Sequence, residues 1–236
     1  MYIAVMGYGV VGSGVVKVLQ MNRDHISRKS RHGTIDVKYI LDIKEINDEN
    51  AHLVTKDFND ILNDSEVHVV VETMGGLHPA FEFVSACLKA GKSVVTSNKE
   101  LVAAHGAELL EIAKEKKVNF LFEASVGGGI PIIYPLHQAS KVNKIASIKG
   151  ILNGTTNFIL TKMSEENYTF ADALKLAQEK GFAEADPTAD LEGLDKSYNK
   201  MFEAYKKVFE TVSDKKDGSF TALIPTDNAK EEYGFL

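Results

Sequence analysis

The first twenty residues, MYIAVMGYGVVGSGVVKVLQ, contain the most restrictive feature of the sequence. An apolar run over residues 2–6 predicts a buried strand and leads directly into Gly7-x-Gly9-x-x-Gly12. Apolar residues then recur at helical spacing over residues 10–21, without proline. A strand, this glycine spacing and a helix together are typical of a dinucleotide-binding unit, whereas the glycines alone would also suit a purely structural turn.

Each glycine has a physical role in such a unit. Gly7 permits the sharp turn, Gly9 leaves room for a pyrophosphate, and Gly12 lets the helix pack closely on the strand. The helix then offers unpaired N–H groups and a positive dipole end to the phosphates. We therefore predict that the cofactor binds at Gly7, Gly9, Val10, Val11 and Gly12.

Strand and helix patterns alternate as far as about residue 125. Further strands are predicted at residues 36–43, 67–71, 93–96 and 118–123. A connecting turn and helix are predicted at 55–62, and longer helices at 79–90 and 99–117. This alternation predicts an α/β fold, with a Rossmann-like parallel sheet covered by helices on both faces over residues 1–134. Ligands usually bind at the carboxyl ends of such strands.

The pattern changes after residue 125, where a glycine-rich stretch is followed by a predicted strand at 144–151. A later helix is predicted with Thr169 as its N-cap and Gly181 as its stop. We expect a second, smaller α+β domain over residues 135–236.

Composition excludes several classes of protein. The 236 residues are 44% apolar and 25% charged with a net charge of −6, so a soluble globular protein is expected and nucleic acid is an unfavourable partner. No apolar stretch is long enough for a membrane span, and the N-terminus does not resemble a signal peptide. We expect a cytoplasmic protein without a membrane partner. The single cysteine, Cys87, is expected in the core rather than as a nucleophile.

The end of the second predicted strand bears on the choice of cofactor. Asp42 lies there, and a carboxylate can bind the ribose 2′-OH of NAD while repelling the 2′-phosphate of NADP. Lys44, together with Arg28, Lys29 and Arg31 before the strand, could instead attract that phosphate. Asp42 favours NAD, and NADP stays open.

Six segments in order resemble the homoserine dehydrogenase family over residues 1–195. They are GYGVVGSG (7–14), VETMGG (71–76), TSNKELVA (96–103), EASVGGGIPII (123–133), GILNGTTNFIL (150–160) and GFAEADPTADLEGLD (181–195). The resemblance implies NAD(P)-dependent interconversion of L-homoserine and L-aspartate 4-semialdehyde, on the route to threonine, methionine and isoleucine. It also implies a substrate and dimerisation domain over residues 135–236, and a homodimer.

The resemblance also assigns roles to residues at the predicted sheet edge. Thr73, Met74 and Gly75 would lie near the nicotinamide, and Lys99 would be the acid/base group, also near the cofactor. A plain turn and a solvated lysine are the alternatives at these positions. The resemblance further implies a sodium or similar cation, held by Glu123 and the carbonyls of Val126, Gly128 and Ile130. A glycine turn without an ion is the alternative there.

The acidic loop at 184–195 is where the resemblance implies substrate binding. Glu184 and Asp190 would bind the amino and hydroxyl groups of homoserine, and Asp195 would polarise the reacting hydroxyl. With Lys99, Glu184 and Asp195 form the expected catalytic set. A merely solvated acidic loop is the alternative.

The sequence departs from the family pattern after Asp195. Four residues on, where the family has a second functional lysine, this sequence has Asn199, flanked by Lys196 and Lys200. The last forty residues do not resemble the family, so we expect a shortened or rearranged substrate domain. Three functions stay open: an active homoserine dehydrogenase, a relative that binds NAD(H) without efficient turnover, and an oxidoreductase for another amino-acid-derived aldehyde.

Overall fold

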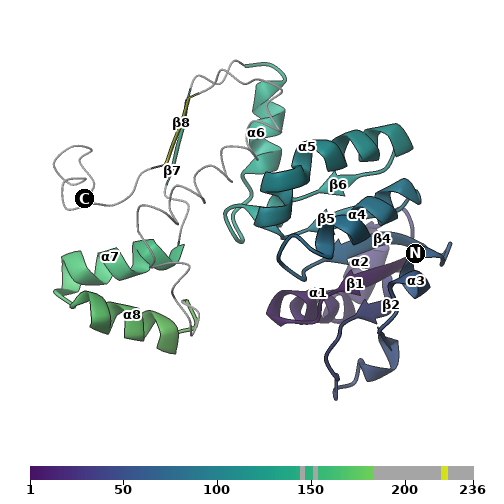
Figure 1. Cartoon of the computed structure of the whole chain (residues 1–236), viewed down its shortest axis with the longest axis horizontal. Helices are drawn as coiled ribbons and strands as arrows, with labels where there is room; N and C mark the ends of the chain where they lie inside the picture. Colours follow the sequence, from purple (N-terminus) through teal and green to yellow (C-terminus); the bar gives the residue numbers. More distant parts are fainter. Residues whose placement is uncertain (144–146, 151–153, 183–218, 223–236) are drawn as a thin grey trace. The chain divides into compact units, whose positions relative to one another are not determined.

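The computed structural model describes residues 1–143, 147–150, 154–182 and 219–222 (Figure 1). The chain divides into two compact units, Met1–Tyr134 and Pro135–Leu236. The role of the second unit in binding substrate stays a prediction.

The first unit is built on a six-stranded parallel sheet in the order β3-β2-β1-β4-β5-β6. Its strands are β1 (Tyr2–Met6), β2 (Asp36–Leu41), β3 (Val54–Thr55), β4 (Val67–Glu72), β5 (Ser93–Thr96) and β6 (Phe120–Leu121). β1 lies at the centre, and its last four residues are at most 4% exposed. This burial explains its unbroken apolar run, and the predicted α/β fold with a Rossmann-like sheet is confirmed.

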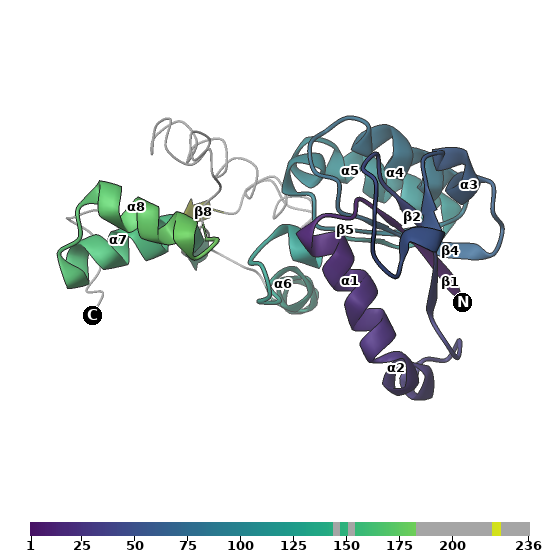
Figure 2. The same ribbon diagram turned by 90° about the horizontal axis from the view of Figure 1, so that it is seen from below.

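Helices cover both faces of this sheet, as Figure 2 shows. One face carries α1 (Val10–Met21) and α2 (Arg23–Lys29). The other carries α3 (Phe58–Leu62), α4 (Ala80–Lys89) and α5 (Lys99–Lys116). The chain therefore leaves β1 toward one face and β4 toward the other, and the carboxyl ends of these neighbouring strands form the switch point at which such sheets bind ligands.

Three details of this unit differ from the sequence-based expectation. Val54–Thr55, which lies at the start of a predicted turn, pairs with β2 as a short edge strand and follows a 3₁₀ turn, η1 (Ala51–Leu53). Arg23–Lys29, between the first predicted helix and the second predicted strand, forms a helix that was not predicted. Glu123 lies in a second 3₁₀ turn, η2 (Glu123–Ser125), rather than at the end of a strand. Its carboxylate accepts hydrogen bonds from backbone N–H groups further along, which requires the chain to turn back at this point.

The second unit contains a helical hairpin and a small sheet. Helix α6 (Ile133–Ser140) crosses the division between the units, and α7 (Gly154–Glu166) and α8 (Phe170–Glu179) pack on each other through Ile159, Ala173 and Ala177. Thr169 caps α8 as predicted, because its hydroxyl accepts the N–H of Asp172 at 3.2 Å. Strands β7 (Ser147–Gly150) and β8 (Ser219–Ala222) pair in parallel.

Two other expectations from the sequence concern membrane spans and Cys87. None of the helices that the structure describes is both long and apolar enough to cross a bilayer. Cys87 is fully buried in α4, and burial raises the pKa of its thiol to about 12. A thiol with such a pKa stays protonated at neutral pH, which confirms Cys87 as a core residue rather than a nucleophile.

Helix α1 packs tightly at Gly12 against the turn that follows β1. A Cβ atom on Gly12 would overlap the carbonyl oxygen of Gly7 and lie 2.8 Å from Oγ1 of Thr73. Gly14 lies two residues further along the same helix, and nothing lies within 4 Å of where its Cβ atom would be. The two glycines of one helix therefore stand in opposite steric situations.

We expect Gly12→Ala to lower the free energy of unfolding by about 1–3 kcal/mol, because the helix must move off the strand. Gly14→Ala, the matched control, is expected to raise it by about 0.5–1 kcal/mol through helix propensity. Urea denaturation of both variants measures the difference. Equal effects of the two substitutions would contradict the close packing at Gly12.

Candidate functional site

The glycine turn holds the ends of β1 and β4 in direct backbone contact. Gly7 has φ +93°, and a Cβ there would lie 2.9 Å from the carbonyl carbon and oxygen of Thr73. The N–H of Thr73 donates to Met6 O at 2.8 Å, and its hydroxyl is 2.9 Å from Gly7 O. Only glycine meets both demands at residue 7: a left-handed φ and contact with the backbone of the next strand.

The start of α1 leaves open space above this contact. Gly9 has φ −77°, and no atom lies within 4 Å of where its Cβ would be. Val10 and Val11, which follow it, are 93% and 53% exposed. The first N–H groups of a helix have no partner within the helix, so this end can receive an anion. The loop therefore fits the pyrophosphate of a dinucleotide.

Asp42 follows β2 and is fastened to the glycine loop. Its carboxylate accepts the N–H of Tyr8 at 2.6 Å and the N–H of Lys44 at 2.8 Å. Burial acts to raise the pKa of Asp42, but these two N–H groups, with the ammonium groups of Lys44 and Lys56, lower it overall. Each carboxylate oxygen keeps a further acceptor position, so Asp42 can still bind a ribose hydroxyl.

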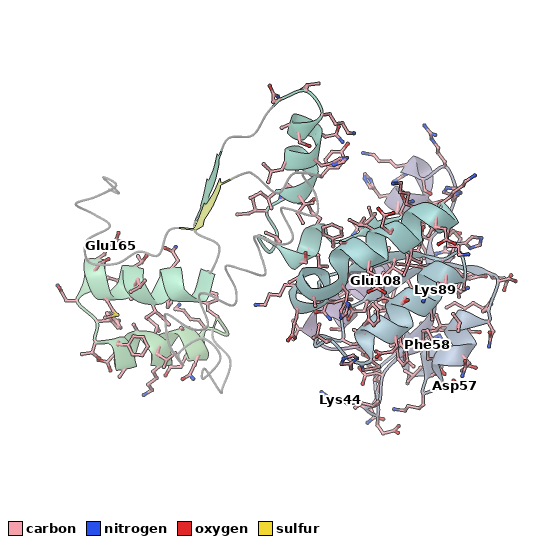
Figure 3. All side chains as sticks on the ribbon, turned by 45° about the horizontal axis from the view of Figure 1, so that its top comes forward. Lys44, Asp57, Phe58, Lys89, Glu108 and Glu165 are labelled. Carbon is pink, nitrogen blue, oxygen red and sulfur yellow. The ribbon has the colours of Figure 1, made fainter. Side chains whose placement is uncertain are left out.

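The basic residues before β2 lie away from this site. Arg28 and Lys29 end α2, and Arg31 also precedes the strand, whereas Asp42 follows its far end. Six strand residues span roughly 17 Å, beyond the reach of these side chains. Of the basic residues that the sequence suggested for the 2′-phosphate, only Lys44 therefore lies near Asp42. The side chain of Lys44 projects from the margin of the first unit (Figure 3).

The segment after β4 carries Thr73, Met74 and Gly75 at the same edge of the sheet. Met74 is half-buried and Gly75 is exposed with φ +78°. Their N–H groups point to the carboxylate of Glu72, at 2.8 and 3.4 Å. Glu72 is completely buried, and sequence reasoning missed it. A carboxylate ending an apolar strand was the available signal, but its third partner, Thr96, comes from β5 and cannot be read from local sequence.

Lys99 is the first residue of α5 and is exposed. It follows β5, so it lies at the carboxyl edge of the sheet with the glycine turn and the Met74–Gly75 loop. Asn98 caps the helix, because its side-chain oxygen accepts the N–H of Leu101 at 3.0 Å. Lys99 places a cation at the positive end of a helix, which is electrostatically unfavourable. Departures from local preference of this kind are common at functional positions.

Glu123 acts as a cap for the start of α6. One carboxylate oxygen accepts the N–H groups of Ile132 and Ile133, the latter at 2.9 Å, and the other accepts that of Tyr134 at 2.8 Å. The second oxygen keeps one acceptor position, so Glu123 can offer a single oxygen to a cation. The other predicted ligands, Val126, Gly128 and Ile130, lie in the glycine-rich turn that follows, where Gly127 and Gly128 have positive φ.

A metal site could also be formed by side chains alone. Within the described residues, no group of three or more His, Cys, Asp or Glu side chains could hold a metal ion.

The predicted substrate-binding residues lie outside the described residues. They are Glu184, Asp190 and Asp195, and the divergent Asn199 lies there too. Their roles stay predictions.

Two protein-family models match the sequence, and both describe the same enzyme. "Homoserine dehydrogenase, NAD binding domain" matches residues 7–123, and "Homoserine dehydrogenase" matches residues 131–216. Together they span most of the chain. The first match covers the glycine turn, Asp42, Lys99 and Glu123. The second covers the acidic loop and extends to residue 216, so the similarity to the family continues beyond residue 195, where we expected it to end.

Individual relatives agree with this. The chain is 43% identical over 201 residues to homoserine dehydrogenase of Lactococcus lactis, covering 83% of this chain and 47% of that protein. It is 42% identical over 198 residues to homoserine dehydrogenase of Bacillus subtilis, covering 82% and 45%. The chain therefore spans slightly less than half the length of these relatives.

Solved structures give the same result. Homoserine dehydrogenase of Thiobacillus denitrificans is 40% identical with a TM-score of 0.71, over 83% of this chain and 46% of that one. A hyperthermophilic archaeal homoserine dehydrogenase in complex with NADPH is 26% identical with a TM-score of 0.71, over 90% and 69%. The resemblance of the six sequence segments is thus confirmed, and the chain belongs to the homoserine dehydrogenase family.

Proposed function

We propose that this chain binds NAD(P)H and takes part in the reduction of L-aspartate 4-semialdehyde to L-homoserine. The observation that carries the proposal is the convergence of three segments at one edge of the sheet. The glycine turn follows β1, the Met74–Gly75 loop follows β4, and Lys99 follows β5, and these strands are adjacent. A cofactor bound at the glycine turn would extend along this edge toward the other two segments.

The chemistry needs two groups at that edge. A bound nicotinamide cofactor would supply a hydride to the carbonyl carbon of the aldehyde, and the carbonyl oxygen would need a proton as the new C–H bond forms. Lys99 carries an ammonium group that can donate this proton and recover it from solvent. Its exposure at the start of α5 leaves it free to reach a bound substrate.

For the cofactor, we favour NAD(H) with some acceptance of NADP(H). Asp42 supplies a negative charge where the ribose hydroxyls would bind, which favours NAD. Lys44 and Lys56 lie close enough to lower the pKa of Asp42 and would partly offset its repulsion of a 2′-phosphate. The family includes an enzyme solved with NADPH, so neither cofactor is foreign to this fold.

The remaining parts of the proposed enzyme rest on the family resemblance. Substrate would be held by Glu184, Asp190 and Asp195, and a sodium or similar cation by Glu123 with the carbonyls of the following turn. We also propose a homodimer. Binding of NAD(H) without turnover is the competing function, because Asn199 stands where the family pattern has a lysine.

The direct experiment follows NADH and NADPH absorbance with the purified chain and aspartate 4-semialdehyde. We expect oxidation of the cofactor, and a loss of kcat of about 100-fold or more in Lys99→Ala, the scale of general acid catalysis. NADH affinity should change less than threefold, because the pyrophosphate binds elsewhere. Lys114→Ala, on the last turn of the same helix, is the control and should keep wild-type kcat.

Cofactor binding without turnover would support the competing function. Absence of binding by either cofactor would contradict both functions.

Gly9→Ala separates a cofactor loop from a structural turn. The added methyl group meets no protein atom and the backbone φ of −77° suits alanine, so the thermal midpoint should stay within about 2 °C of wild type. NADH affinity should fall at least tenfold, because the methyl group occupies space that the pyrophosphate needs. Fluorescence titration with NADH measures this. Unchanged affinity would make the loop a turn only.

Asp42→Asn tests the cofactor preference. We expect the ratio of NADH affinity to NADPH affinity to fall at least tenfold, because the charge that repels a 2′-phosphate is removed. General loosening of the loop would weaken both cofactors alike and leave the ratio unchanged. Asp36→Asn is the matched control, since Asp36 lies at the opposite end of β2, paired with Arg23 at 2.7 Å. A ratio that moves equally in both variants would count against a role for Asp42.

A further inference from the structure

The buried carboxylate of Glu72 joins the segment after β4 to the end of β5. Glu72 ends β4 and is 0% exposed. One of its oxygens accepts the N–H groups of Met74 and Gly75, and the other accepts the hydroxyl of Thr96 at 2.5 Å. Its three donors therefore come from the segment after β4 and from the last residue of β5. A side chain in the middle of the sheet thus reaches both segments at the carboxyl edge.

The Thr96 hydroxyl donates one hydrogen bond and accepts another. Oγ1 of Thr96 accepts the N–H of Asn98 at 2.9 Å, so its own hydrogen is available for Glu72. Thr96 is 1% exposed, so solvent does not compete for this hydrogen. The hydroxyl therefore connects the Glu72 carboxylate to the backbone just before α5 through two hydrogen bonds.

Asn98 completes a ring of hydrogen bonds. Its amide group donates to Gly76 O at 2.6 Å, while its oxygen caps α5 through the N–H of Leu101. The Met74–Gly76 loop is consequently held at two points, by Glu72 and by Asn98. Lys99 is the next residue after Asn98, so the same ring of hydrogen bonds fixes the position of the Lys99 backbone.

A requirement of the fold alone does not account for this arrangement. Burying a carboxylate is costly, and well-packed apolar side chains often serve a core equally well or better. The neighbouring β4 residues show that alternative, because they are almost all valine. The carboxylate adds directed hydrogen bonds, because it accepts at the same time from the loop after β4 and from the last residue of β5.

We propose that Glu72 is a positioning residue, which with Thr96 and Asn98 holds the Met74–Gly76 loop in a set place relative to Lys99. The role rests on the proposed function, in which the nicotinamide lies beside this loop and Lys99 supplies the proton. Glu72 itself is buried and would touch neither substrate nor cofactor.

Thr96→Val and Thr96→Ser form the matched pair that tests this role. Valine keeps the shape and removes the hydroxyl, whereas serine keeps the hydroxyl. In the full chain with NADH bound, we expect Thr96→Val to speed amide hydrogen exchange at Met74, Gly75 and Leu101 at least tenfold. Exchange at Leu109, deeper in α5, should stay within threefold. Thr96→Ser should match wild type at all four amides.

Turnover provides the second readout. We expect kcat of Thr96→Val to fall at least tenfold while the KM for NADH changes less than threefold, with recovery in Thr96→Ser. Unchanged exchange at the three amides, or loosening that extends equally to Leu109, would overturn the positioning role. If wild type does not reduce aspartate 4-semialdehyde, the proposed function fails, and the exchange pattern still decides the role of Glu72.

Discussion

The first unit depends on the contact between the backbone of Gly7 and that of Thr73. A side chain at residue 7 would meet the carbonyl group of Thr73 at 2.9 Å, so the two strand ends can lie this close only without one. The Thr73 N–H and hydroxyl then bind the carbonyl groups of Met6 and Gly7, which fixes the turn against β4. The open space at Gly9 and the exposed start of α1 follow from this geometry.

A second constraint is the parallel order of the sheet. Since every strand runs the same way, residues that follow β1, β2, β4 and β5 gather at one edge. Asp42, bound to the Tyr8 N–H, links the edge at β2 to the glycine turn, and Glu72 links the edge at β4 to that at β5. Both links are side-chain carboxyl groups that accept backbone or hydroxyl hydrogen bonds, so these hydrogen bonds hold the segments that would bind the cofactor.

Local signals predicted much of this from sequence. The glycine spacing, the apolar runs and the Thr169 cap each depend on residues close together in the chain, and each is found as expected. The hydrogen bond from Thr96 to Glu72 could not be predicted this way, because strand order brings Thr96 to Glu72. The predicted topology could have excluded the basic residues near Arg28 from the ribose site. They precede β2 and Asp42 follows it, so they lie at opposite ends of the strand. The short pairing of Val54–Thr55 carried no sequence signal beyond two β-branched residues.

The most direct test of the central claim is a crystal structure of the chain with NADH. The account predicts the pyrophosphate over Gly9 and the first N–H groups of α1, a ribose hydroxyl at Asp42, and the nicotinamide beside Met74 and Gly75 on the side of Lys99. A pyrophosphate bound away from the glycine turn, or a nicotinamide outside the edge shared by β4 and β5, would contradict it.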